Sequence, residues 1–322
     1  MADMHAMLQS SLTAALSLYE ERLEEAFPFA LRLDVLDSSD FLAYIQPNGN
    51  GFDLRISTGV VSAISELWPS GDQTIETCLT WLILHELNHA RLGHFLFNGG
   101  ACLVGPAEMD ALSLSSRGEA KPMLISKLSE YERALAPLCL ELQADDDSTA
   151  MLLGYYHDAD WQDLRQKIAC IFTVMILIEN AEAKLNKPTA SHPHATTRML
   201  MLFAHLLEMP NIPTLIAEAN GKTIEPTSEA EIDRFMNEVV LPCFADAQTI
   251  AHQARCEPAI NDLQDMEAFF GDLNIIRYGD LIKDRLNTQA AMQLAELWPI
   301  NRKILGLLQE QDIEIYMLGS DH

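Results

Sequence analysis

Residues 74–97 (TIETCLTWLILHELNHARLGHFLF) form the stretch that most constrains the fold. The centre of this run is apolar on every face of a helix, so a helix here has to be covered on all sides by the rest of the chain. The ionisable residues His85, Glu86 and His89 follow this apolar centre. We therefore predict a buried helix whose polar residues are set into a dry, apolar wall.

The segments before this run show two periodicities. Residues 3–27 repeat apolar side chains at helical spacing, whereas residues 29–36, 41–46 and 52–58 alternate apolar and polar side chains as strands do. The sequence PNGNG at 47–51 contains two Asn-Gly pairs, which favour a hairpin turn. We expect a small antiparallel sheet to precede the buried helix.

The rest of the chain has mainly helical patterns, which cover about 125–156, 160–184, 195–208, 228–252 and 288–309. Ser228 and Glu231 form a capping box at the start of the fourth of these helices. The predicted fold class is α+β and predominantly helical. A stretch rich in Pro, Asn, Gly and Thr before residue 228 suggests a division into a domain at 1–225 and a helical C-terminal region at 226–322.

The net charge of −26 limits the partners of the chain. Such a surface repels nucleic-acid phosphates and anionic lipid, which argues against a sequence-independent nucleic-acid binder. The longest apolar run, residues 168–179, has about a dozen residues, whereas a membrane-spanning helix needs about 20. The N-terminus lacks the features of a signal peptide, and the six cysteines are scattered without a CxxC pair. We expect a cytoplasmic protein with reduced thiols and no membrane insertion.

The segment from His85 to His89 (HELNH) reads HExxH on the predicted helix. A step of four residues places both imidazoles on one helical face, where they can hold one metal ion. Glu86 stands beside the first histidine and can reach a metal-bound water, whose pKa zinc lowers to about 7. The alternative is a chance pair of histidines on an ordinary helix, so the rest of the chain has to supply a third ligand.

Two residues are candidates for the third ligand. On a continuing helix, His94 would point about 180° away from His85, so we expect His94 to be a polar residue at the helix end or a partner for the last helical carbonyls. The sequence ELQAD instead places Glu141 and Asp145 one turn apart on a second helix. Glu141 can then join His85 and His89 as a ligand, and Asp145 can accept the outer N–H of a ligating histidine. Without HExxH, this segment would be interpreted as a solvated acidic face.

A third motif, SHPHATTR, covers residues 191–198. Pro193 ends one helix, which places the histidines and the arginine at the start of the next. His192 can donate a hydrogen bond to the oxyanion of a tetrahedral intermediate, and Arg198 can orient His192 or an acidic ligand. We therefore predict His192 and Arg198 as catalytic residues beside Glu86. The alternative is a surface loop with incidental histidines.

Together, these motifs resemble the gluzincin metallopeptidases related to HtpX, Oma and the CaaX prenyl protease. Their pattern is HExxH, then ExxAD, then Ser/Thr-His-Pro followed by an arginine, matched here by His85–His89, Glu141–Asp145 and His192–Arg198. The resemblance covers roughly residues 40–210 and implies a zincin-like core that binds Zn²⁺. It also implies that the strand at 52–58 is the sheet edge on which the substrate backbone is aligned. Those relatives carry transmembrane helices, which this chain lacks, and its C-terminal third has no counterpart in them.

A weaker resemblance, based on HExxH alone, links the chain to the phage-exclusion Lit peptidases. We predict a zinc-dependent peptidase that hydrolyses peptide bonds of a protein or peptide substrate through a water activated by Glu86. The alternative is a regulatory or catalytically silent zinc-fold protein that acts by binding a partner. The presence of Glu86 favours the enzyme, because a scaffold that only binds has no need of a base. The sequence gives no indication of the oligomeric state.

Overall fold

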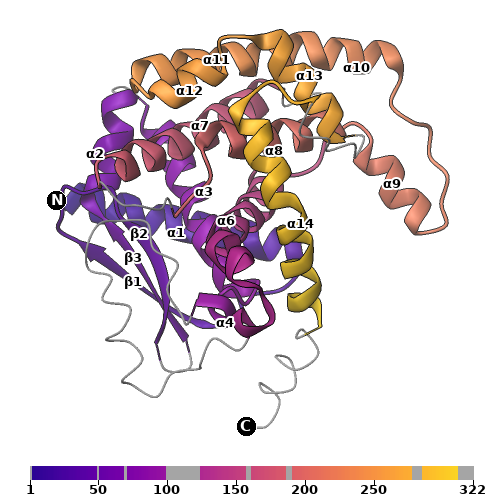
Figure 1. The fold of residues 1–322 in the computed structure, drawn as a ribbon. Coiled ribbons are helices and arrows are strands. Elements are labelled where there is room, and N and C mark those ends of the chain that lie inside the picture. The colour runs from indigo at the N-terminus through magenta and orange to yellow at the C-terminus, as the bar shows by residue number, and fades with distance from the viewer. Residues whose placement is uncertain are drawn as a thin grey trace.

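The computed structural model describes residues 2–48, 51–68, 71–98, 124–156, 161–185, 191–277 and 285–310. In these ranges the chain is predominantly helical and contains one three-stranded mixed sheet, which confirms the predicted α+β class (Figure 1). The α-helices in chain order are α1 (Ala2–Leu23), α2 (Thr58–Leu67), α3 (Asp72–Arg91), α4 (Phe95–Asn98), α6 (Glu130–Leu153), α7 (Trp161–Ala183), α8 (Ala195–Glu208), α9 (Ile212–Ala219), α10 (Glu229–Phe235), α11 (Leu241–Gln253), α12 (Glu257–Asp262), α13 (Met266–Arg277) and α14 (Gln289–Gln309).

The sheet consists of β1 (Ala30–Leu36), β2 (Ala43–Asn48) and β3 (Gly51–Ser57) in the order β1-β3-β2. β2 and β3 pair antiparallel, as the Asn-Gly signal predicts, although Gly49 and Asn50 of the turn lie outside the described residues. β1 runs parallel to β3, so the prediction of an antiparallel sheet was wrong for this pair. A turn signal reports only on the two strands that it joins.

This strand order also corrects the expected edge of the sheet. β3, which contains the strand predicted at 52–58, lies in the middle, and β1 and β2 are the two edges of the described sheet. β2 is the edge that contacts α3, whereas β1 contacts α1. The strand next to the predicted metal-binding helix is therefore β2 and not β3.

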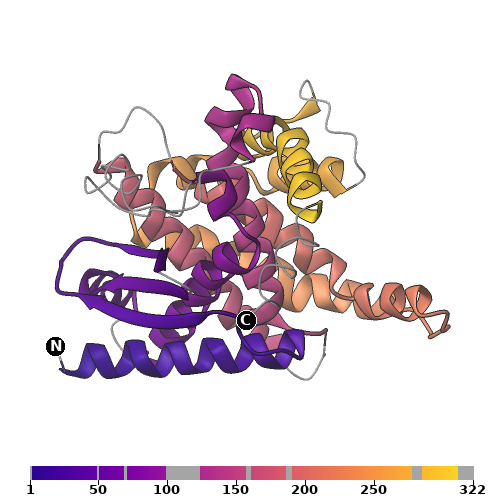
Figure 2. The same cartoon turned by 90° about the horizontal axis from the view of Figure 1, so that it is seen from below.

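Helix α3 is buried, as its apolar sequence predicts. It packs against α1, α6, α7 and β2, and every residue from Cys78 to Ala90 is buried. Figure 2 shows α1 lying along one side of the molecule, next to the sheet. Because α3 is covered on all sides, its polar residues can find partners only on the elements that pack against it.

The end of α3 differs from the predicted range of 74–97. The helix ends at Arg91, and Gly93 follows with a φ of 71°. The N–H of Gly93 donates to the carbonyl of Ala90 at 3.2 Å, and the N–H of His94 donates to the carbonyl of His89 at 3.1 Å. This pair of bonds is the Schellman motif, which glycine favours because it adopts positive φ without strain. The chain therefore turns back at Gly93 instead of continuing as a helix.

Helix α6 begins with a reciprocal capping box. The Ser129 hydroxyl accepts from the N–H of Glu132, and the Glu132 carboxylate accepts from the N–H of Ser129 at 2.7 Å. A short 3₁₀ turn, η2 (Ile125–Lys127), precedes the cap, and Pro137 lies inside the helix without ending it. α6 packs directly against α3, which brings its middle turns beside the HExxH residues.

The C-terminal helices form a second layer over α7, α8 and α6. The Ser228 half of the predicted capping box is confirmed, since its hydroxyl accepts from the N–H of Glu231 at 3.3 Å. α10 continues through a π-helical segment, η4 (Met236–Val240), into α11, which packs on α7. α14 lies against α6 and α8 (Figure 1). Its apolar residues belong to the same core cluster as those of α3, and the division at residue 225 stays a prediction.

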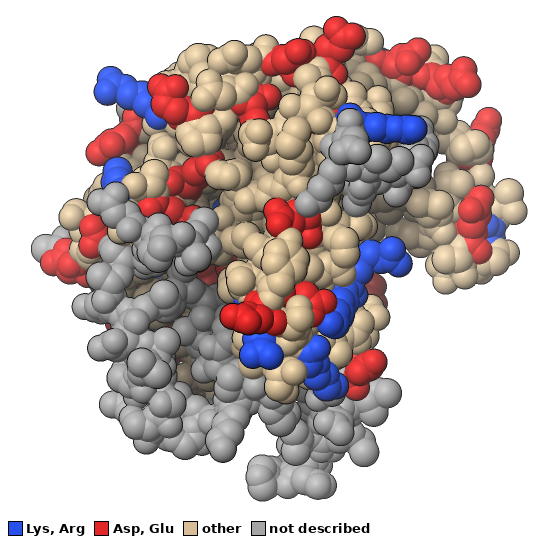
Figure 3. All heavy atoms as spheres, in the orientation of Figure 1, with Lys and Arg blue, Asp and Glu red and all other residues tan. Residues whose placement is uncertain are grey.

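Two features of the surface complete the description. α9 projects from the body in both ribbon views (Figures 1 and 2), and acidic side chains are spread over the described face in Figure 3. Among the described residues, no single helix is long and apolar enough to cross a membrane. α8 and α9 meet that test only when they are counted together, across a bend of 67°.

Candidate metal centre

Helices α3 and α6 bring the three predicted ligands together. His85 Nε2 lies 3.0 Å from His89 Nε2 and 3.1 Å from Glu141 Oε2, and His89 Nε2 lies 3.5 Å from Glu141 Oε1. All three residues are buried. Ala144 is also fully buried, one turn after Glu141, where a larger side chain would push the helices apart. This group of two imidazoles and one carboxylate could hold a metal ion.

The hydrogen-bonding state of the two histidines shows why a cation fits here. His85 Nδ1 faces Asp145 Oδ1 at 2.9 Å, and His89 Nδ1 faces His94 Nδ1 at 2.8 Å. If both imidazoles are neutral and carry their proton on Nδ1, the two Nε2 lone pairs point at each other across 3.0 Å. Glu141 adds a further lone pair beside them. A proton on His85 or a metal ion between the three donors would remove this repulsion.

The pKa values of the site describe the same attraction for positive charge. Burial opposes the protonation of His85, but the adjacent Asp145 and Glu141 carboxylates outweigh it and raise the pKa of His85 to about 10. Burial also opposes the ionisation of Glu141, and the neighbouring histidines His192 and His89 nevertheless hold its pKa well below the usual range. The carboxylates therefore stay ionised and favour positive charge beside them, carried by a protonated histidine or by a bound metal ion.

Glu86 lies beside this group without joining it. Its carboxylate is 1 % exposed, and burial raises its pKa to about 7. Among the described residues, Glu86 Oε2 has no hydrogen-bond partner. A buried carboxylate with a free oxygen and a pKa near neutrality can take up and release a proton at physiological pH.

Asp145 and Arg198 stand behind His85. Arg198 Nε and a terminal guanidinium nitrogen donate to the two Asp145 oxygens at 2.6 and 2.7 Å, and both side chains are buried. The guanidinium also lies 5.9 Å from the centre of the Trp81 ring. Arg198 was predicted among the catalytic residues, but its contacts place it one layer away from the ligands. Asp145 thus lies between Arg198 and His85.

His192, the predicted oxyanion donor, lies on the other side of Glu141. Its Nε2 is 3.0 Å from Glu141 Oε2, and its Nδ1 is 2.8 Å from Glu182 Oε1. Burial opposes protonation, but Glu141 and Glu182 raise the pKa of His192 to about 9. At neutral pH the ring is therefore an imidazolium, in which both nitrogens carry a proton to donate.

Glu182 was missed by the sequence analysis. It lies at the end of α7, where it accepts from the N–H of Ser191 at 3.0 Å as well as facing His192. One turn earlier, Glu179 Oε1 lies 2.9 Å from His194 Nδ1. Two glutamates three residues apart thus pair with two histidines two residues apart. That spacing was a usable signal, because residues i and i+3 share one helical face.

The contacts of the His94 ring also differ from the prediction. Because α3 ends in the Schellman turn, the ring of His94 returns to His89, with the two Nδ1 atoms 2.8 Å apart. His94 lies at the end of the helix, as expected, but its ring faces His89 and Gln143 instead of the last helical carbonyls. His94 is 1 % exposed, and burial together with the neighbouring His89 lowers its pKa well below the usual value. The glycine in HARLGH was the signal that the helix would turn here.

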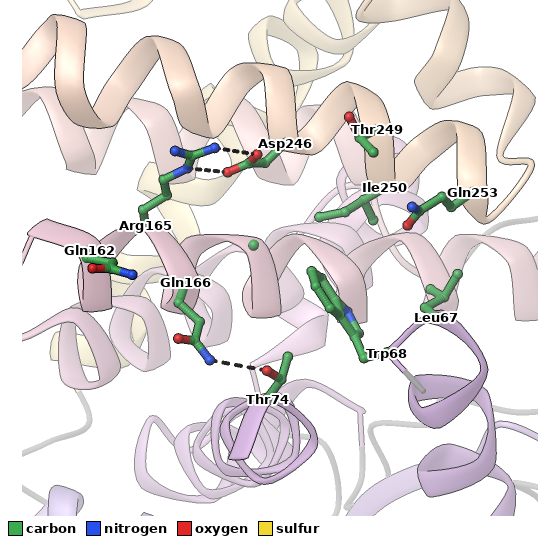
Figure 4. A pocket seen from close by; sticks show the side chains of 11 residues that line it. Leu67, Trp68, Thr74, Gln162, Arg165, Gln166, Asp246, Thr249, Ile250 and Gln253 are labelled. Atoms are coloured by element: carbon green, nitrogen blue, oxygen red, sulfur yellow. Dashed lines mark hydrogen bonds and ion pairs between the residues drawn. The ribbon is translucent and has the colours of Figure 1, made fainter. Parts of the chain in front are cut away.

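A separate hollow of about 400 Å³ lies between α7 and α11 (Figure 4). Its walls include Trp68, Gln162 and the ion pair between Arg165 and Asp246. None of the residues that line it belongs to the metal group, so this hollow is not part of the candidate centre.

The geometry of the site is at present the main guide to function. The chain matched none of the protein families, curated proteins and solved structures with which it was compared.

Proposed function

We propose that this chain is a zinc-dependent peptidase with a zincin-like core. The observation that carries the proposal is the unpaired, buried Glu86 carboxylate oxygen, which lies beside the group formed by His85, His89 and Glu141. A structural metal site needs ligands but no adjacent base, whereas hydrolysis needs both.

The spacing of the ligand atoms supports zinc. Tetrahedral zinc with bonds of about 2.0–2.2 Å to nitrogen and oxygen separates its ligands by about 3.3 Å. The three separations between His85, His89 and Glu141 are 3.0, 3.1 and 3.5 Å. Two imidazoles and one carboxylate form a common ligand set of catalytic zinc, in which the fourth position stays available for water or substrate.

The surrounding residues then have distinct roles in hydrolysis. Zinc, when bound, acts as a Lewis acid that acidifies water and polarises the scissile carbonyl. Glu86 takes the proton from the attacking water and passes it to the leaving amine. The imidazolium of His192, kept protonated by Glu182, donates to the oxyanion that develops on the former carbonyl oxygen. Asp145 and Arg198 hold His85 in orientation.

The edge strand β2 offers a place for the peptide backbone. The N–H of Ser57 donates to the carbonyl of Leu42 at 2.9 Å. In an antiparallel pair, every second residue bonds to the partner strand, so the N–H and C=O groups of Ala43 and Ile45 point away from β3. The backbone of Ile45 also lies close enough to Glu86 to favour its charged form. A peptide added as a strand along β2 would therefore run past the base.

A second candidate is a catalytically silent zinc-fold protein that acts by binding a partner. The burial of the site favours it, because His85, Glu86 and Glu141 are each at most 3 % exposed. Closed metal sites are typical of structural zinc. The two candidates differ in their need for Glu86.

The experiment that separates them is Glu86→Gln, with Glu76→Gln as a matched control on the same helix. Purified protein is analysed for zinc by mass spectrometry and incubated with denatured proteins, and new N-termini are counted. We expect about one zinc per chain in all three proteins, and a loss of cleavage of about 10²–10⁴-fold in Glu86→Gln alone. Equal cleavage by wild type and Glu86→Gln, or a zinc-free wild type with its ligands intact, contradicts the peptidase.

A further inference from the structure

Four buried polar side chains form a continuous chain from the candidate metal centre to the last helix. His89 Nδ1 lies 2.8 Å from His94 Nδ1, and His94 Nε2 lies 3.2 Å from Gln143 Oε1. Gln143 Nε2 then donates to Asn301 Oδ1 at 2.6 Å. The residues come from α3, the turn after it, α6 and α14 in that order. All four are at most 6 % exposed, so water does not readily replace these contacts.

The orientation of the Gln143 and Asn301 amides sets the direction of the hydrogen bonds along this chain. The Asn301 oxygen accepts from the Gln143 amide nitrogen, which leaves the Gln143 oxygen to face His94. His94 Nε2 has to donate to that oxygen, so the neutral ring of His94 presents a lone pair at Nδ1. His89 then donates from Nδ1 and keeps its own lone pair at Nε2, the atom that faces Glu141. Each link permits only one tautomer of the next.

We infer that Asn301 is a positioning residue for the metal centre, acting through Gln143 and His94 to hold His89 in its ligating tautomer and orientation. This inference rests on the proposed zinc site and assigns a role to α14. Partners of ligating histidines raise ligand basicity and fix ring orientation. Asp145 and Arg198 serve His85 in this way, and the chain from Asn301 serves His89.

The packing of α14 keeps Asn301 in place. The Thr288 hydroxyl caps the helix by accepting from the N–H of Ala291 at 3.2 Å. At the surface, Lys303 Nζ pairs with Glu132 of α6 at 2.7 Å. The Lys303–Glu132 pair joins α14 to α6 without touching the polar chain. It provides a control that loosens the same helix pair but leaves Asn301 intact.

The test compares Asn301→Leu, which removes the acceptor at similar volume, with Asn301→Asp, which keeps an acceptor oxygen in either protonation state. Zinc affinity of the full chain is measured by competition with a chromogenic chelator, and the visible spectrum of the Co²⁺-substituted protein reports ligand geometry. We expect Asn301→Leu to bind zinc about 10–100-fold more weakly, with a shifted Co²⁺ spectrum. Asn301→Asp restores both properties. If Asn301→Leu fails to fold, Asn301→Ala removes the same acceptor without adding bulk, since alanine is a good helix former.

Lys303→Met is the matched control, and it should leave zinc affinity and the Co²⁺ spectrum unchanged. Wild-type affinity and spectrum in Asn301→Leu overturn the inference, as does an equal loss of affinity in Lys303→Met, which would indicate general loosening of α14. A wild type that binds zinc but cleaves nothing contradicts the peptidase and leaves this inference standing. Cleavage that depends on Glu86, together with unchanged zinc affinity in Asn301→Leu, supports the peptidase and overturns the inference about Asn301.

Discussion

Replacing Arg198 with methionine removes one half of the buried ion pair behind the metal centre. Both guanidinium contacts to Asp145, at 2.6 and 2.7 Å, are lost, whereas the methionine side chain still packs near Trp81. Asp145 is left buried with His85 Nδ1, at 2.9 Å, as its remaining polar neighbour among these contacts. The Arg198→Met variant therefore tests how strongly the buried Arg198–Asp145 pair stabilises the fold.

The expected magnitude follows from burial. Removing one partner of a buried ion pair costs about 3–5 kcal/mol, because the other charge stays uncompensated. Here the Asp145 neighbours Arg198 and His85 hold its pKa at about 2 against the effect of burial, so it remains ionised at neutral pH. The raised pKa of His85, about 10, allows its imidazolium to offset part of the loss before a metal binds. We therefore expect the lower end of the range, about 3 kcal/mol.

The assay is urea denaturation of chelator-treated protein at pH 7, followed by circular dichroism. Arg165→Met is the control, because Arg165 makes the same two-bond contact with Asp246, at 2.5 and 2.7 Å, but both side chains are about a third or more exposed. Exposed pairs contribute about 0–1 kcal/mol. Equal losses in the two variants would refute the argument that burial makes the Arg198 pair critical.

Two further predictions concern protons. Glu182→Gln should lower the pKa of His192, because one of two nearby carboxylates loses its charge; the alkaline limb of the pH–rate profile then moves down by about one unit. Glu179→Gln is the control, because the Glu179 carboxylate pairs with His194, and it should leave the alkaline limb in place. An unmoved alkaline limb in Glu182→Gln argues against His192 as the proton donor. Zinc binding should release a proton, because His85 is protonated up to its pKa of about 10 and must be neutral to ligate. Zinc affinity then rises with pH below 10. Calorimetry of zinc binding in buffers of different ionisation enthalpy measures the number of protons released. Binding heats that do not depend on the buffer contradict the proton release.

The sequence predicted the features that depend on a single helix. His85 and His89 share one face because they are four residues apart, and Glu141 and Asp145 do so for the same reason. The apolar composition around them predicted that α3 would be buried. These statements need only the helical period and the character of neighbouring side chains. They located the candidate ligands before any contact between helices was considered.

Contacts between distant segments were decided by tertiary structure alone. Strand order placed β1 beside β3, which no turn signal could specify, because β1 and β3 are not joined by a turn. Arg198 pairs with Asp145 across 53 residues of sequence, whereas the sequence predicted that it would orient His192 or an acidic ligand. Gln143 meets Asn301 across 158 residues; Gln143 fills a variable position of ELQAD, and Asn301 belongs to none of the motifs.

Apart from Asp145, which the ELQAD spacing predicted, the second layer around the ligands therefore lay beyond the sequence, although the ligands did not. A helical period fixes which side chains leave the same face of a helix, but it does not fix which other helix covers that face. The polar partner of each histidine ring depends on that choice, because a buried nitrogen bonds with whatever donor or acceptor the packed core brings within about 3 Å. For His85 and His89 the core supplied Arg198 through Asp145 and Asn301 through Gln143.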